Sequence, residues 1–64
     1  MDIITSQRTY SSRANAVKRL EKVFGDKLDK ARWLIAVKED GRFVPTVLGH
    51  NEVWAAHHGI MVIA

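Results

Sequence analysis

Apolar residues recur along this chain with two different periods. Between residues 12 and 24 they lie three or four positions apart, at Ala16, Val17, Leu20, Val23 and Phe24. This spacing places them on one face of a helix. Gly25 follows directly, where a left-handed C-terminal cap favours a residue without a Cβ atom. We therefore predict one long amphipathic helix over residues 12–24, and the rest of the chain is organised around it.

Shorter apolar segments predict strands at residues 2–6, 32–38, 42–48 and 60–63. The second of these is apolar on both faces, which predicts a central strand. The third contains Pro45, which cannot donate to a ladder, so we expect an edge strand or a bulge there. Asp40 and Gly41 stand between these two segments and supply the positive φ that a tight hairpin turn needs.

Polar and glycine-containing segments set the remaining boundaries. Thr9, Ser11 and Ser12 each carry a side-chain oxygen that can cap the long helix, and the sequence does not choose among them. Residues 26–31 predict a turn or one loose helical turn, with Leu28 directed inward. Asn51 is expected to cap a short helix over residues 52–58 that ends at Gly59.

The elements follow the order strand, helix, strand, strand, helix, strand in a single domain of residues 1–64. This order predicts an α+β fold in which one long amphipathic helix packs on a small, mainly antiparallel sheet of three to four strands. A ferredoxin-like split βαβ unit has the same order. Its third strand is central, whereas Pro45 favours an edge, so we prefer the simpler α+β sheet and keep both alternatives.

Composition narrows the possible chemistry. The chain has no Cys, and Lys plus Arg exceed Asp plus Glu by three. His57 and His58 are adjacent and His50 stands apart, so no helical His pair predicts a metal site. Nucleophile, metalloprotease and phosphate-loop motifs are missing. We expect no enzyme, no cofactor and no metal. The apolar runs are too short to cross a bilayer, so we expect a cytoplasmic protein without a membrane partner.

The polar side of the long helix is basic, with Lys18, Arg19 and Lys22 close together and Arg42 at the hairpin as an extension. These four residues predict a surface for an acidic partner. A solvated helix surface explains the same residues, because charged helix surfaces are common.

The start of the long helix is a second candidate site. Arg8 and Arg13 bracket Ser11 and Ser12 there. Free N–H groups and two guanidinium groups favour a bound phosphate or carboxylate. Ordinary capping by a serine explains the same two serines.

Three segments carry a resemblance to known proteins, at residues 14–19, 24–26 and 40–45. With these segments, the chain resembles small phage- and prophage-encoded α+β proteins, some of which are anti-defence inhibitors such as anti-CRISPR proteins. The resemblance implies a non-enzymatic inhibitor that docks on a host protein or nucleoprotein complex. The alternative is direct binding of nucleic acid without sequence specificity.

The last predicted strand is apolar at every position, through Ile60, Met61, Val62 and Ile63. A strand with one solvated face alternates instead. Either this strand is central and lies under the helices, or its outer face or edge meets a second copy of the chain. We predict a homodimer or a heteromeric contact through this strand.

Overall fold

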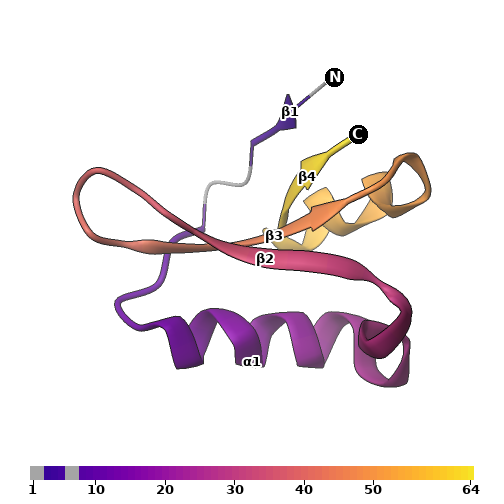
Figure 1. Cartoon of the computed structure of the whole chain (residues 1–64), viewed down its shortest axis with the longest axis horizontal. Coiled ribbons are helices and arrows are strands. Elements are labelled where there is room, and N and C mark those ends of the chain that lie inside the picture. The colour runs from indigo at the N-terminus through magenta and orange to yellow at the C-terminus, as the bar shows by residue number, and fades with distance from the viewer. Residues whose placement is uncertain (1–2, 6–7) are drawn as a thin grey trace.

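The computed structural model in Figure 1 describes residues 3–5 and 8–64. In chain order its elements are β1 (Ile3–Ile4), α1 (Arg13–Phe24), the 3-10 helix η1 (Gly25–Lys30), β2 (Arg32–Val37), β3 (Phe43–Leu48), the 3-10 helix η2 (His50–His58) and β4 (Met61–Ile63). The predicted α+β class is confirmed. Of the strand predicted over residues 2–6, the structure describes residues 3–5, and Asp2 and Ser6 lie outside the described residues.

The long helix forms where the apolar period predicted it. Ser12 is the N-cap, and its hydroxyl accepts a hydrogen bond from the N–H of Asn15 at 3.2 Å. At the other end, Gly25 adopts a φ of 58° and its N–H donates to the carbonyl of Glu21. Ala16 and Leu20 are fully buried. The predicted helix phase is therefore confirmed, and Ser12 is the cap among the three candidates. Gly25 ends the helix as predicted, but its ψ of −130° differs from that of the left-handed cap that was expected.

Strands β2 and β3 form the predicted hairpin, in a continuous antiparallel register from the pair Arg32 and Leu48 to the pair Val37 and Phe43. Its loop closes where the N–H of Lys38 donates to the carbonyl of Arg42 at 2.8 Å. Gly41 has a φ of 84°, which an L side chain rarely adopts.

The positions of β2 and β3 in the sheet are the reverse of the prediction. The strand order is β1-β4-β3-β2, so β3 is central and β2 is at the edge. Pro45 fits because its missing N–H faces a gap. Phe43 exchanges backbone hydrogen bonds with Tyr10 on that side of β3, and β4 begins to pair only at Thr46. Backbone groups alternate in direction along a strand, so Pro45 falls between these two contacts.

Strand β4 is central, as one of the two alternatives for it required. It pairs antiparallel with β1 and parallel with β3. The sheet is therefore mixed. The ferredoxin-like alternative is not confirmed, because its first strand lies between the third and the fourth, whereas β1 forms an edge here. Both edges of β4 are occupied within the chain, so the predicted homodimer has no free edge of this strand to use.

A parallel pair of strands needs a crossover connection, and η2 supplies it between β3 and β4. It starts at His50, and Gly49 occupies the N-cap position without a side-chain capping bond. The predicted cap at Asn51 is therefore wrong, because the backbone turns two residues earlier, at a glycine with a φ of 135°. Gly59 ends η2 in the left-handed conformation, as predicted.

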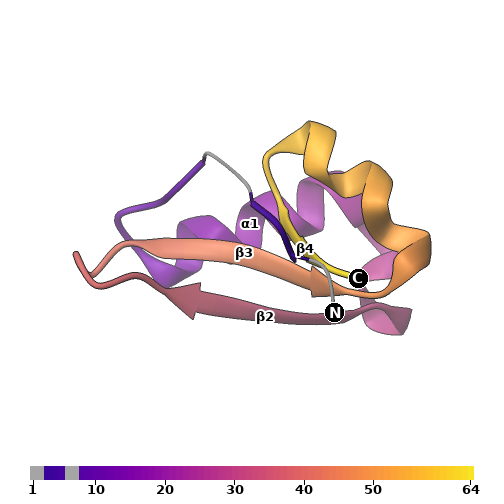
Figure 2. The same ribbon diagram turned by 90° about the horizontal axis from the view of Figure 1, so that it is seen from above.

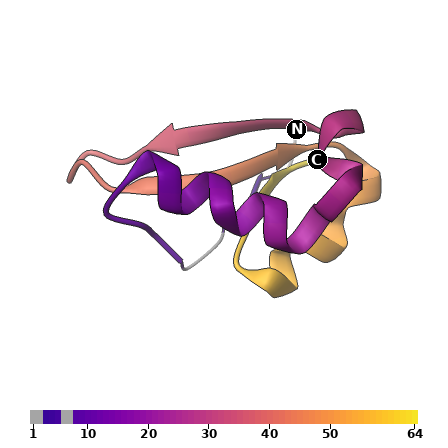
Figure 3. The same cartoon turned by 90° about the horizontal axis from the view of Figure 1, so that it is seen from below.

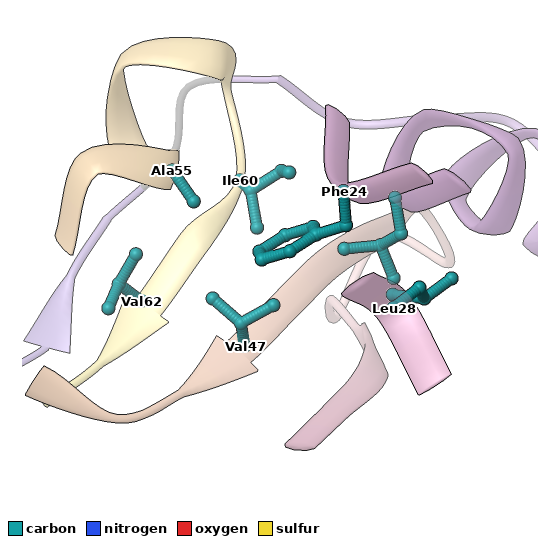
Figure 4. Close-up of a cluster of buried hydrophobic side chains, with 7 residues drawn as sticks. Phe24, Leu28, Val47, Ala55, Ile60 and Val62 are labelled. Atoms are coloured by element: carbon teal, nitrogen blue, oxygen red, sulfur yellow. The ribbon is translucent and has the colours of Figure 1, made fainter. Parts of the chain in front are cut away.

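The described helices α1, η1 and η2 contribute to one core cluster against the sheet. In Figure 1, α1 runs beneath β2 and β3, and the view from below in Figure 3 shows η2 beside the C-terminal half of α1. The core fills the space between the helices and the sheet. Figure 4 shows Phe24 directed toward Val47 and Ile60, with Leu28 from η1 and Ala55 from η2 at the two ends of the cluster. Leu28 is buried, which confirms the prediction for residues 26–31.

Candidate interaction surface

Side chains alternate between the two faces of the sheet, and the register assigns each to a face. Val47 and Val62 pair in register and belong to the core with α1 and η2. The neighbouring residues along each strand therefore point to the opposite side. We call this second side the open face, formed by Ile3, Arg32, Leu34, Ala36, Val44, Thr46, Leu48, Met61 and Ile63. Viewed from above, no described helix lies over it (Figure 2).

The open face is apolar apart from Arg32 and Thr46. Leu34 remains 40% exposed and Ile3 62% exposed. A sheet with one face in water normally places polar side chains there. Contiguous exposed apolar surface on a protein marks an interaction site more often than scattered single residues do. The open face carries exposed Ile3 and Leu34 on its two edge strands and half-buried apolar residues between them, so it is a candidate for contact with another molecule.

The polar group at the centre of the open face already has a hydrogen-bond partner within the chain. Thr46 is fully buried although no described helix lies over this face (Figure 2). Figure 1 shows that β4 and β1 rise out of the plane of β2 and β3. The Thr46 hydroxyl donates to the carbonyl of Val44 at 3.1 Å. Val44 is only 4% exposed. The open face is thus an apolar surface with one buried, hydrogen-bonded polar group at its centre.

The open face continues into a free strand edge. Lys38 is hydrogen-bonded to Arg42, so alternate residues of β2 direct their backbone groups toward β3. The backbone groups of Trp33, Ile35 and Val37 point the other way, where no described strand pairs with them. An apolar edge without proline or a central charge is open to pairing with another chain.

The predicted basic surface on α1 is only partly assembled. Lys18 and Lys22 are exposed. Arg19 is half-buried and turns toward η2, where its Nε and Nη2 donate to the carbonyl of His58 at 3.1 and 2.9 Å. The expectation that all three side chains point to solvent is therefore wrong for Arg19, because its guanidinium satisfies a carbonyl at the end of η2.

Arg42 also has an internal partner. Its Nε donates to the hydroxyl of Thr9 at 2.6 Å and its Nη2 to the carbonyl of Thr9 at 3.2 Å. These bonds hold Arg42 against the segment that leads into α1. Lys18 and Lys22 are therefore exposed to solvent, whereas Arg19 and Arg42 form hydrogen bonds within the fold.

The residues of the predicted anion site at the start of α1 also have different surroundings. Ser12 uses its hydroxyl as the N-cap, and Ser11 and Arg13 are exposed. The aliphatic stem of Arg8 packs against Gly59, where an added Cβ atom would lie 2.7 Å from the Arg8 Cδ. No acidic residue lies in the first turn of α1, as the sequence indicated.

A hollow of about 420 Å³ lies where the end of α1 and η1 face η2. Its lining consists of Phe24, Lys27, Lys30, Ala31, Glu52 and Trp54. Trp54 is 41% exposed, although its ring centroid lies 5.0 Å from that of Phe24. The sequence pattern did not predict this hollow, because its lining residues come from segments far apart in the sequence.

Potential metal ligands are dispersed over the described residues. Within residues 3–5 and 8–64, no three His, Cys, Asp or Glu side chains are placed to hold a metal ion together. His58 makes an edge contact with the Trp54 ring at a centroid distance of 5.8 Å. In the same part of the chain, no helix is long and apolar enough to cross a membrane.

Comparisons with known protein families, with curated proteins and with solved structures find no match for this chain. The interaction surface is therefore inferred from its own geometry.

Proposed function

We propose that this chain is a non-enzymatic binding protein that docks on a partner protein through the open face. The supporting observation is that the sheet is apolar on both sides, while its helices cover only one. Burial in the core explains Val47 and Val62. It does not explain Leu34 and Ile3, which stay exposed.

The chemistry of the open face suits an apolar protein surface. Its exposed residues Ile3 and Leu34 lie on the two edge strands, and the buried Thr46 between them is already hydrogen-bonded, so an apolar partner leaves no polar group unpaired there. The free edge of β2 adds outward backbone donors and acceptors that a partner strand can use. Interfaces of this kind concentrate their binding energy in a few central apolar contacts.

The narrower proposal, an inhibitor from a phage or another mobile element that acts on a host protein or nucleoprotein complex, rests on the resemblance described above. The open face supports the binding role in general and does not select that partner.

The test places a charge on the open face. Leu34→Glu and Ile3→Glu alter exposed side chains, so circular dichroism and the melting temperature should stay close to those of the unchanged chain. The double variant Lys18→Glu, Lys22→Glu on α1 is the matched control. Crosslinked complexes recovered from cells that express a tagged chain should disappear with the open-face variants and persist with the control.

Light scattering of the purified chain accompanies this experiment. A dimer that the open-face variants convert to a monomer would assign the face to a second copy and overturn docking on a different protein. Loss of the complexes in the control variant alone would return the site to the basic side of α1.

Direct nucleic-acid binding is the second candidate, favoured by the exposure of Lys18 and Lys22 one helical turn apart. Arg19 is a weaker contributor than its position suggested, because its guanidinium is bound to His58. Binding of this kind should weaken steeply with salt, by roughly 0.7–0.9 units of log slope per phosphate contact. A salt-independent complex would exclude it.

A further inference from the structure

The hollow beside Trp54 lies on the helical side of the molecule, and the open face does not contribute to it. Trp54 is its most exposed aromatic side chain. Phe24 packs on the indole at 5.0 Å and His58 contacts it edge-on at 5.8 Å. These contacts hold the ring in place before any ligand arrives, which lowers the entropy lost on binding.

Two lysines share the rim of this hollow. Lys27 and Lys30 are three residues apart in η1, and a 3-10 helix has three residues per turn, so their side chains leave the same side of it. Both are exposed, and within the described part of the chain neither forms an ion pair. Asp26 and Asp29 belong to η1 but do not line the hollow. The hollow is therefore lined by two positive charges and one negative charge, that of Glu52.

Glu52 lines the hollow together with the aromatic ring. Its carboxylate disfavours a ligand that is anionic throughout, such as a run of acidic residues. It suits a ligand with an N–H donor at one end and an anion at the other, because a carboxylate accepts from the exocyclic amine or the ring N–H that every unpaired base carries. The volume of about 420 Å³ lies in the range of small-ligand sites.

We propose that this hollow binds one nucleotide of a single-stranded nucleic acid. The base stacks on the exposed part of Trp54, and the adjoining phosphates lie against Lys27 and Lys30. Only an unpaired base can leave its neighbours to reach a single ring in a hollow, so a duplex is excluded. Stacking on an aromatic side chain tolerates every base, so the site has little sequence preference.

The experiment follows Trp54 fluorescence. Trp33→Phe leaves Trp54 as the one tryptophan, since the chain has two. Single-stranded oligo-dT titrated into this variant at low salt should quench the emission in a saturable way, and a duplex of the same length should not. Stacking of a base on the ring is the physical cause of the quenching.

Two pairs of substitutions separate this site from general electrostatic attraction. Lys27→Gln with Lys30→Gln removes two charges at the hollow, and Lys18→Gln with Lys22→Gln removes two charges from α1. All four side chains are exposed, so both double variants should fold. We expect the first pair to weaken oligo-dT binding roughly tenfold and to lower the salt slope by about 1.4, at 0.7 per phosphate. The second pair should leave quenching nearly unchanged.

Equal losses from the two double variants would overturn the proposal and indicate attraction by net charge alone. Absence of quenching in a folded Trp33→Phe protein would overturn it as well. Binding of poly-glutamate as tight as that of oligo-dT would show that the base contributes nothing, with the same consequence. Leu34→Glu on the open face should not affect oligo-dT binding, so this test stands apart from protein docking.

Discussion

The two faces of the sheet have similar side chains and different surroundings. On the helical side, Trp33, Val47 and Val62 pack against α1 and η2. On the open face, Leu34 and Ile3 have the same apolar chemistry, and no described helix covers them. Apolar residues on the first face explain why the chain folds. Those on the second exceed what the fold requires, so their position is better explained by a contact outside the chain.

The sharpest test of this comparison uses one residue type on each side of the sheet. Leu20→Ala removes a fully buried side chain from α1, and Leu34→Ala truncates one that is 40% exposed on the open face. We expect the first to cost about 2–5 kcal/mol of unfolding free energy. The second should cost at most about 1 kcal/mol, because much of its surface is already in water.

Urea unfolding monitored by circular dichroism gives both values from one protocol. Equal costs would mean that the open face is packed as tightly as the core in the isolated chain. The comparison between the two faces would then fail.

The same two faces explain what the sequence could and could not predict. Leu20 and Phe24 marked the helix phase correctly, because a period of 3.6 residues depends only on the helix itself. The apolar pattern of β2 suggested a central strand, and β2 is an edge. Such a pattern reports the chemistry of both sides of a strand but not whether anything in the chain covers them.

Pro45 led to the opposite error, because it predicted an edge strand where β3 is central. A proline removes one N–H at one position, and the prediction extended this to the whole strand. In the structure that position lies between the Tyr10 contact and the start of β4, so the remaining residues of β3 pair on both sides. Only the arrangement of segments far apart in the sequence could reveal the gap.

Site prediction from sequence was limited for a related reason. Lys18 and Lys22 are exposed on α1, as their helical positions indicated. The partners of Arg19 and Arg42 lie on other segments, at His58 and Thr9, and no local pattern predicts such contacts. The absence of alternation at residues 60–63 and the apolar residues on both sides of the segment 32–38 were the signals of the open face available in the sequence.

A second test concerns how α1 and η2, which cover the helical side of the sheet, are held together. Arg19 ties α1 to the end of η2 through two hydrogen bonds to one carbonyl. Arg19→Ala should lower the unfolding free energy by roughly 0.5–1.5 kcal/mol. Lys18→Ala on the neighbouring exposed position should change it by less than about 0.5 kcal/mol.

Hydrogen exchange sharpens this second test by locating the effect. Faster exchange in η2 and β4, with α1 unchanged, is expected for Arg19→Ala because the lost contact joins η2 to α1. Equal stabilities for the two variants would show that Arg19 behaves as a solvated side chain and does not hold η2 against α1.

The smallest expected effect lies at the centre of the open face. Thr46→Val replaces the buried hydroxyl with a methyl group of similar size. The hydroxyl shares the carbonyl of Val44, which by alternation along the ladder also faces β2 and keeps its acceptor role there. Losing the second bond should therefore change the unfolding free energy by at most about 1 kcal/mol.

Thr46 is fully buried, so partner binding should also be retained in Thr46→Val, in contrast to Leu34→Glu. A loss of binding in a folded Thr46→Val protein would mean that a partner contacts Thr46 itself, although this residue is buried in the isolated chain.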